Sequence, residues 1–253
     1  MRNLGLCSIT LVAIATIACG SSGPSNPSGP TNDAGPSAPP YIYATVFTQE
    51  GGTIPPYFDF LEEVSVCTDG YQCAAPVTNA TVKVNGAALT YDSMSGAYFG
   101  AFLIPEGAQV SLQVTVGSTV YSASGTQFTS APTVTAPDAG AVWQASVANT
   151  ITWTGGAPAA GANYFVQMVN FVPPSFHQAF PPSPQSGELP ITSTSATVDA
   201  GTLPPATSFN LVVGIVTPGA ILQNSGGIPI PDAGAGSGLW LGALSTNVGV
   251  QTQ

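Results

Sequence analysis

Apolar and polar side chains alternate along much of this chain, and this period of two restricts its fold more than any other feature. The segment QVSLQVTV at 109–116 carries its valines and leucine on one face and serine, glutamine and threonine on the other. ATVKV at 80–84 repeats the pattern with Val82 and Val84. Because successive side chains of a β-strand point to opposite faces, the alternation predicts strands that are buried on one side.

The rest of the chain after residue 40 also favours strands. NTITWTG at 149–155 is expected to bury Ile151 and Trp153, and FNLVVGIV at 209–216 to bury alternate residues from Phe209 to Ile215. The 29 glycines and 24 prolines divide the chain into short pieces, and no segment beyond residue 18 sustains a helical apolar stripe. We therefore predict an all-β fold.

The length of this part of the chain indicates two tandem β-sandwich domains, because one seven-stranded sandwich takes about 100 residues. The segment TSAPTVTAPDAG at 129–140 interrupts the strand pattern. We place the boundary there and expect one sandwich at 41–131 and a second at 132–253.

Both expected domains resemble known sandwich families. The strand at 80–84 and the turns GAY at 96–98 and PEG at 105–107 resemble the transthyretin-type sandwich of carboxypeptidase regulatory-like domains. The second domain opens with P-x-x-G-x-x-W ending at Trp143, then I-T-W ending at Trp153. This resembles immunoglobulin-like or fibronectin-like domains, as in a fungal cell-wall glucan-synthesis family and its bacterial look-alikes. Both resemblances imply a fold and no activity.

The first 18 residues have the layout of a secretory signal peptide. Arg2 gives a positive end, residues 4–17 carry no charge, and small or apolar residues follow. The apolar run is shorter than the roughly 20 residues of a membrane-spanning helix, which disfavours a permanent anchor of that kind.

The residues IACG at 17–20 resemble a bacterial lipobox, with Thr16 at the position where leucine is commonest. In that family, signal peptidase II cuts before the cysteine, whose sulfur receives a diacylglycerol and whose new amine is acylated, as with palmitate. The resemblance implies a lipid-anchored protein of the bacterial cell envelope, held in the bilayer through acylated Cys19. Gly20 is not the aspartate that marks inner-membrane retention in enteric bacteria, so we expect the outer membrane. Ordinary cleavage after Ala15 is the alternative.

The number of cysteines helps to decide between these two cleavage sites. Cleavage after Ala15 leaves Cys19, Cys67 and Cys73, and hence an unpaired thiol in an oxidising compartment, whereas lipidation of Cys19 leaves one pair. We expect Cys67 and Cys73 to close a small disulfide ring. With these two cysteines and one histidine, a zinc site would need carboxylates as well, so no metal and no cofactor are expected.

Residues 19–40 separate the expected anchor from the strands. They are rich in glycine, serine and proline and contain no large apolar side chain. Such a segment cannot bury enough surface to fold, so we expect a disordered tether that holds the domains away from the membrane.

The charge balance excludes one class of partner. After Cys19 the chain contains all 12 acidic residues and has Lys83 as its only lysine or arginine. Because nucleic-acid binding needs cationic side chains that displace counterions from phosphates, no nucleic acid is expected as a partner.

The segment FVPPSFHQAFPPSP at 171–184 places three phenylalanines among prolines. Exposed aromatic rings on a stiff loop suit stacking on a sugar or docking on a partner. The candidate ligand-binding residues are Phe171, Phe176 and Phe180 of this segment, together with Trp143 and Trp240 elsewhere in the chain. A loop that folds back over its own sandwich is the alternative.

No catalytic residue is expected. His177 is the only histidine, and no G-x-S-x-G motif accompanies it. Asp59, Glu62 and Glu63 cluster at 57–64, and paired acids could hydrolyse glycosides if they faced each other across a cleft. We expect a surface role for them instead.

The leading hypothesis is thus an exported, membrane-anchored lipoprotein that is not an enzyme and that binds a polysaccharide or an envelope protein, or has a structural role. A carbohydrate-binding module that uses the loop aromatics is the first alternative, and an acid-pair glycoside hydrolase the second.

Overall fold

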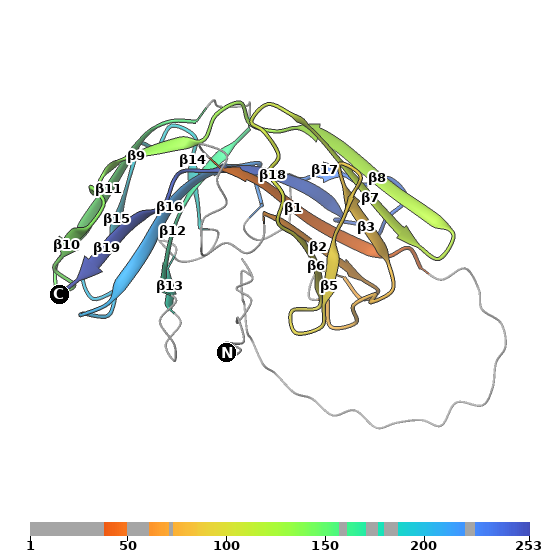
Figure 1. Cartoon of the computed structure of the whole chain (residues 1–253), viewed down its shortest axis with the longest axis horizontal. Helices are drawn as coiled ribbons and strands as arrows, with labels where there is room; N and C mark the ends of the chain where they lie inside the picture. Colours follow the sequence, from red (N-terminus) through yellow and green to blue (C-terminus); the bar gives the residue numbers. More distant parts are fainter. Residues whose placement is uncertain are drawn as a thin grey trace, which may run out of the picture.

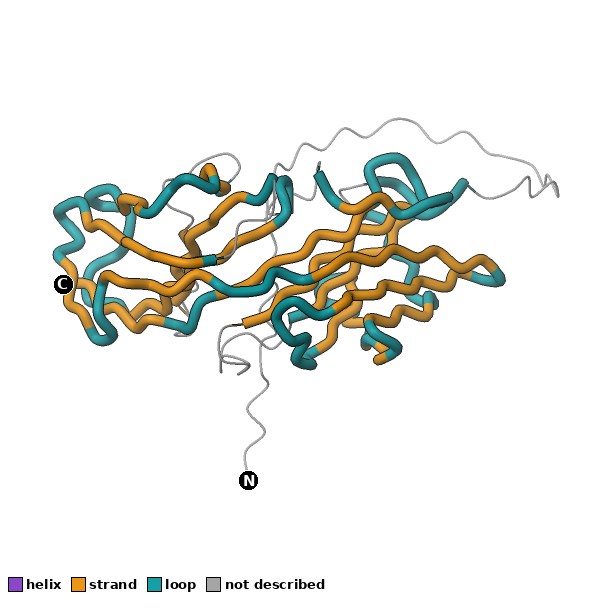
Figure 2. The backbone as a smooth tube through the Cα atoms, turned by 90° about the horizontal axis from the view of Figure 1, so that it is seen from above, coloured by secondary structure: helices purple, strands orange, loops and turns teal. Residues whose placement is uncertain are grey.

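A computed structural model describes residues 38–49, 61–70, 73–156, 161–170, 177–179, 187–220 and 226–253, with the backbone alone for Gln49 and for 177–179. The expected signal peptide, Cys19 and the tether up to residue 37 lie outside these ranges. Every helix or strand element within them is a β-strand, which confirms the all-β prediction (Figure 2). No helix in the described ranges has the length and hydrophobicity to cross a membrane.

The strands vary in length from two to nine residues. They are β1 (Tyr41–Gln49), β2 (Glu62–Cys67), β3 (Thr81–Val84), β4 (Ala87–Ala88), β5 (Thr90–Asp92), β6 (Ala97–Gly100), β7 (Gln109–Val116), β8 (Thr119–Thr126), β9 (Pro132–Ala136), β10 (Ala141–Trp143), β11 (Asn149–Gly155), β12 (Asn163–Asn170), β13 (His177–Ala179), β14 (Glu188–Pro190), β15 (Ser195–Val198), β16 (Ser208–Val216), β17 (Ile228–Pro229), β18 (Gly238–Leu244) and β19 (Val248–Thr252).

These strands form three sheets. The largest has 12 strands, with the path β10-β19-β16-β18-β1-β2-β6-β5 and with β12, β13, β14 and β17 attached beside it. A four-stranded sheet has the order β4-β3-β7-β8, and a three-stranded sheet has the order β15-β11-β9.

The two small sheets cover the same face of the 12-stranded sheet, one near each end (Figure 1). At one end Ile42 of β1 shares the core with Leu112 of β7, and at the other Leu211 of β16 shares it with Trp153 of β11. All four side chains are almost completely buried. This is β-sandwich packing, and it follows from the alternation of apolar residues in the strands.

The opposite face of the 12-stranded sheet carries a second apolar cluster, built around Tyr43, Phe47, Phe165 and Trp240. Strands β16 and β18 are therefore buried on both faces. The alternate burial expected at 209–216 is therefore only part of the observed pattern, because Val212, Gly214 and Val216 are buried as well.

Two glycines of the 12-stranded sheet make room for this second cluster. A Cβ atom on Gly214 would overlap the ring of Phe165, and one on Gly242 would overlap the ring of Phe47. The aromatic rings thus lie directly on the backbone of the sheet, which only glycine allows.

The chain passes from the four-stranded to the three-stranded sheet at 127–131, next to the expected domain boundary. The 12-stranded sheet continues past that point, because β1 pairs in parallel with β18, with Tyr43 opposite Gly238. The division into two domains at 131 and 132 stays a prediction.

Candidate functional site

The structure places two of the five candidate aromatic residues. Trp143 ends β10 and is 7% exposed, and Trp240 lies in the second apolar cluster and is 2% exposed. Neither ring offers a free face to solvent, so burial favours a core role for both, and their ligand-binding role stays a prediction. Phe171, Phe176 and Phe180 lie outside the described residues.

The disulfide prediction is confirmed. Cys67, the buried last residue of β2, is bonded to Cys73 across a separation of six residues. The backbone at Cys67 also forms an isolated bridge with Pro76. The ring therefore fixes the end of β2 to the chain that leads towards β3.

Glu62 is buried inside the sandwich, so the expected surface role is wrong for this residue. It is 0% exposed and lies on the same face of β2 as Val64. Its Oε2 accepts a 3.4 Å hydrogen bond from the amide of Phe102, and its Oε1 has no partner. Burial raises the pKa of Glu62 to about 8, against the opposing effect of the Phe102 amide.

Glu63 points to the opposite face of the sheet, because neighbouring residues of a strand alternate. It pairs with Thr45 of β1 and Phe99 of β6, and burial raises its pKa to about 8 as well. The carboxyls of Glu62 and Glu63 are thus separated by the backbone of β2 and cannot face each other across a cleft. Asp59 lies outside the described residues.

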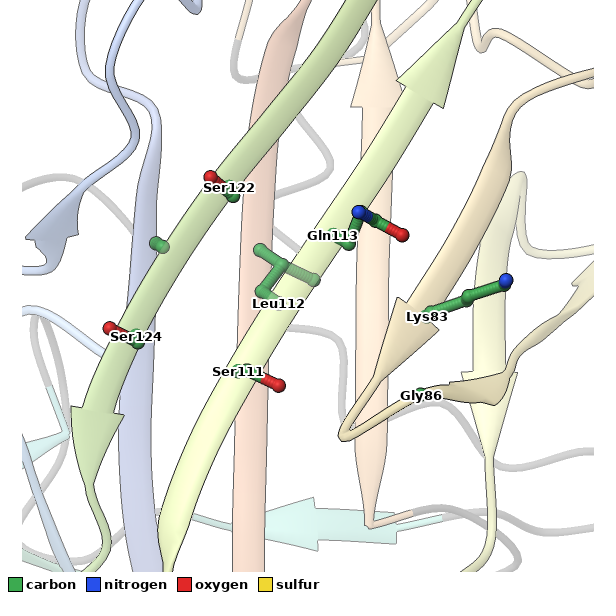
Figure 3. Close-up of a pocket in the computed structure, with 8 residues that line it drawn as sticks. Lys83, Gly86, Ser111, Leu112, Gln113, Ser122 and Ser124 are labelled. Carbon is green, nitrogen blue, oxygen red and sulfur yellow. The ribbon is translucent and has the colours of Figure 1, made fainter.

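The described part of the chain has an open groove on the outer face of the four-stranded sheet, with a volume of about 370 Å³ (Figure 3). It exists because β3 and β7 turn Val82, Val84, Val110, Leu112 and Val114 inward, β8 turns Tyr121 inward, and the polar residues between them face outward. The lining residues are Lys83, Gly86, Ser111, Leu112, Gln113, Ser122, Ala123 and Ser124.

Strand register arranges these polar side chains in rows. Lys83 of β3 is opposite Gln113 of β7, which is opposite Ser122 of β8. Ser111 and Ser124 form a second row. Since neighbouring strands lie about 4.8 Å apart, the first row extends over about 10 Å. Figure 3 shows Lys83 at one margin of the groove and the two serines of β8 at the other.

Side-chain hydrogen bonds hold one end of the groove in place. Asn85 adopts a positive φ of 48° in the turn after β3. Its Nδ2 donates to the carbonyl of Gln109 at 3.0 Å, and its Oδ1 accepts from the amide of Ser111 at 2.7 Å. Beside it, Nε2 of Gln109 donates to Oγ1 of Thr126 at 2.6 Å. The turn that carries Gly86 is thereby fixed to β7.

Lys83 is the only lysine or arginine among the described residues, and no carboxylate of that part of the chain forms an ion pair with it. The side chain is half-buried. The whole sequence contains 12 acidic residues, and no acidic residue of the described ranges lines the groove. The groove can thus donate and accept hydrogen bonds and contribute one positive charge.

No group of three or more histidine, cysteine or acidic side chains that could hold a metal ion occurs within the described ranges.

Strand alternation already indicated that Lys83, Ser111 and Gln113 point outward. The sequence did not indicate that β8 completes the groove, because the pairing of strands is not visible in the alternation of any one of them. A useful signal was present nonetheless: apart from Val120, the outward residues of the three strands are polar or small, and Lys83 is the only charged one.

No protein-family model matches this chain, and the search of curated proteins found no match.

Proposed function

We propose that this chain is an exported lipoprotein of the bacterial cell envelope and a non-enzymatic binding protein whose ligand is a polysaccharide. The observation that carries the binding proposal is the groove over β3, β7 and β8, with Lys83, Gln113 and Ser122 in one row. A hydroxyl-rich ligand satisfies the hydrogen-bonding capacity of such a surface, whereas an apolar ligand would leave those groups unpaired.

The position of the groove supports a polymer as its ligand. It lies on the outer face of a sheet rather than in an enclosed cavity (Figure 3). Small molecules are held in pockets that bury most of their surface. A polysaccharide can instead lie across the strands and continue beyond both margins.

Export and lipid attachment are supported by the N-terminal sequence and by the disulfide. The lipobox resemblance at 17–20 supports acylation of Cys19, and residues 20–40 have the composition of a flexible tether. The bond between Cys67 and Cys73 fits an oxidising compartment, where structural disulfides persist.

A non-enzymatic role is supported by the arrangement of the acids. Glycoside hydrolysis needs two carboxyl groups on either side of the scissile bond. Glu62 and Glu63 point to opposite faces of β2 and do not provide such a pair. The resemblances to transthyretin-type and immunoglobulin-like modules also imply a fold and no activity.

The anchor is tested by mass spectrometry of the native N-terminal peptide. We expect an acylated Cys19 as the first residue of the mature chain, and a Cys19→Ser variant that is released from the membrane fraction. An unacylated chain that begins at Thr16 would overturn the proposed anchor.

The binding role is tested by retention on a panel of insoluble polysaccharides. We expect a Gln113→Ala/Ser122→Ala double variant to lose about tenfold in affinity through the lost hydrogen bonds. Ser195→Ala is the matched control, because Ser195 is an exposed strand serine of the other small sheet.

The alternative, binding through the loop aromatics, gives a different result in the same assay. A Phe176→Ala/Phe180→Ala variant would then lose retention while the Gln113→Ala/Ser122→Ala variant kept it. That outcome would transfer the polysaccharide site from the groove to the segment at 171–184.

A further inference from the structure

Lys83 gives the groove a positive charge, which hydrogen bonding to neutral sugars does not require. The proposed function needs only neutral donors and acceptors, which Gln113 and the serines supply. The groove nevertheless contains the one cation of the described residues, unpaired with any carboxylate there. In a chain with a net charge of -10, an anionic group beside this lysine meets an attraction that no other lysine or arginine of the described residues can offer.

We infer that the ligand of this groove is a polysaccharide that carries carboxylates, spaced so that one carboxylated sugar alternates with a neutral one. This inference rests on the proposed polysaccharide-binding function of the same groove. A carboxylate at Lys83 would complete a charge-assisted hydrogen bond, which is stronger than a bond between neutral groups.

The length of the row from Lys83 to Ser122 is the basis for expecting one carboxylate in every two sugars. Its length of about 10 Å is comparable with a disaccharide. Lys83 lies at one end, and Gln113 and Ser122 offer neutral hydrogen-bonding groups along the remainder. A carboxylated sugar at the lysine thus places its neutral neighbour over the amide and the hydroxyl.

Charge also excludes a densely anionic polymer. Only one ammonium group is available, and the remaining net charge of the protein repels further carboxylates. A polymer with a carboxylate on every sugar would bring one of them over Gln113 and Ser122, where no cation compensates it.

The test uses the full-length protein, purified in detergent, and two forms of one polymer. The first is hyaluronan, in which glucuronate alternates with a neutral N-acetylated sugar. The second is the same polymer with its carboxylates reduced to alcohols. Affinities are measured by biolayer interferometry at low salt, for the wild type, Lys83→Gln and Lys83→Arg.

We expect the wild type to bind native hyaluronan about tenfold more tightly than the reduced form, as one charge-assisted hydrogen bond implies. Lys83→Gln should abolish this preference, and Lys83→Arg should keep it. The preference should also shrink as salt is added, because the charge pair lies at an open surface.

Equal affinity of the wild type for the two polymers, or unchanged affinity in Lys83→Gln, would overturn the inference. The proposed function survives that result if Gln113→Ala/Ser122→Ala weakens both polymers equally. If that double variant leaves retention unchanged on every polysaccharide tested, the groove is not a polysaccharide site, and the binding role proposed for it fails as well.

Discussion

The backbone amide of Ile42 donates a 2.9 Å hydrogen bond to Oγ of Ser237, 195 residues further along the chain. The bond lies at the start of the parallel pairing between β1 and β18, where Tyr43 is opposite Gly238. Through this pairing the part of the 12-stranded sheet under β3 and β7 is joined to the part under β9 and β11. The hydroxyl of Ser237 therefore links two segments that are distant in the sequence.

Substitution Ser237→Ala should lower the free energy of unfolding by about 1 kcal/mol, because the amide of buried Ile42 loses its partner. The measurement is urea unfolding followed by tryptophan fluorescence. Ser195→Ala, at an exposed strand position, should change the free energy by less than about 0.5 kcal/mol. Equal effects of the two substitutions would mean that the hydrogen bond contributes nothing.

Much of the local structure could be predicted from the sequence. Val110, Leu112 and Val114 are buried and Ser111 and Gln113 are exposed, as the period of two requires. The pairing of β1 with β18 could not be predicted in the same way. Parallel pairing between distant segments depends on packing across the whole sheet, and no local pattern in either strand specifies its partner.

The candidate site was predictable to a similar extent. The outward direction of Lys83 follows from the alternation in β3, but its row with Gln113 and Ser122 depends on strand order and register. Glu62 could not be placed correctly, because a carboxyl is normally exposed and only the packing of β2 against the small sheet buries it.

The close contact between Gly214 and Phe165 predicts a strong effect of a single methyl group. Gly214→Ala should destabilise the protein by about 2 kcal/mol, because the new Cβ would force the buried ring of Phe165 to move. Gly249→Ala is the matched control in β19, where a Cβ meets no atom within 4 Å. Thermal unfolding of both variants separates the cost of overlap from the general effect of replacing glycine in a strand.

Because of the disulfide, we predict that a reductant lowers the stability of the protein. Replacement of Cys67 and Cys73 by alanine should lower the free energy of unfolding by about 2 kcal/mol, the value that chain entropy gives for so short a ring. A reductant should lower the free energy of unfolding of the wild type by a similar amount and leave that of the double variant unchanged. A variant as stable as the oxidised wild type would contradict a stabilising role for the bond.

From the buried carboxyl of Glu62 we predict that the free energy of unfolding falls as the pH rises. Its pKa is raised by burial from 4.5 to about 8, so the folded state favours the protonated carboxyl. The stabilisation is complete below the pKa of the unfolded chain and is lost as the pH increases from 4.5 to about 8. The slope that one such group contributes approaches about 1.4 kcal/mol per pH unit.

Glu62→Gln should remove this contribution, so that urea unfolding of the variant depends less on pH over that range and the variant is the more stable protein at pH 8 and above. Asp92→Asn is the control of opposite sign. Hydrogen bonds from Met94 and Ser95 lower the pKa of Asp92, so its contribution is lost only in acid. Asp92→Asn should leave the slope of the unfolding free energy against pH unchanged above pH 5. An unchanged slope in Glu62→Gln would mean that the buried carboxyl is already ionised in the folded protein.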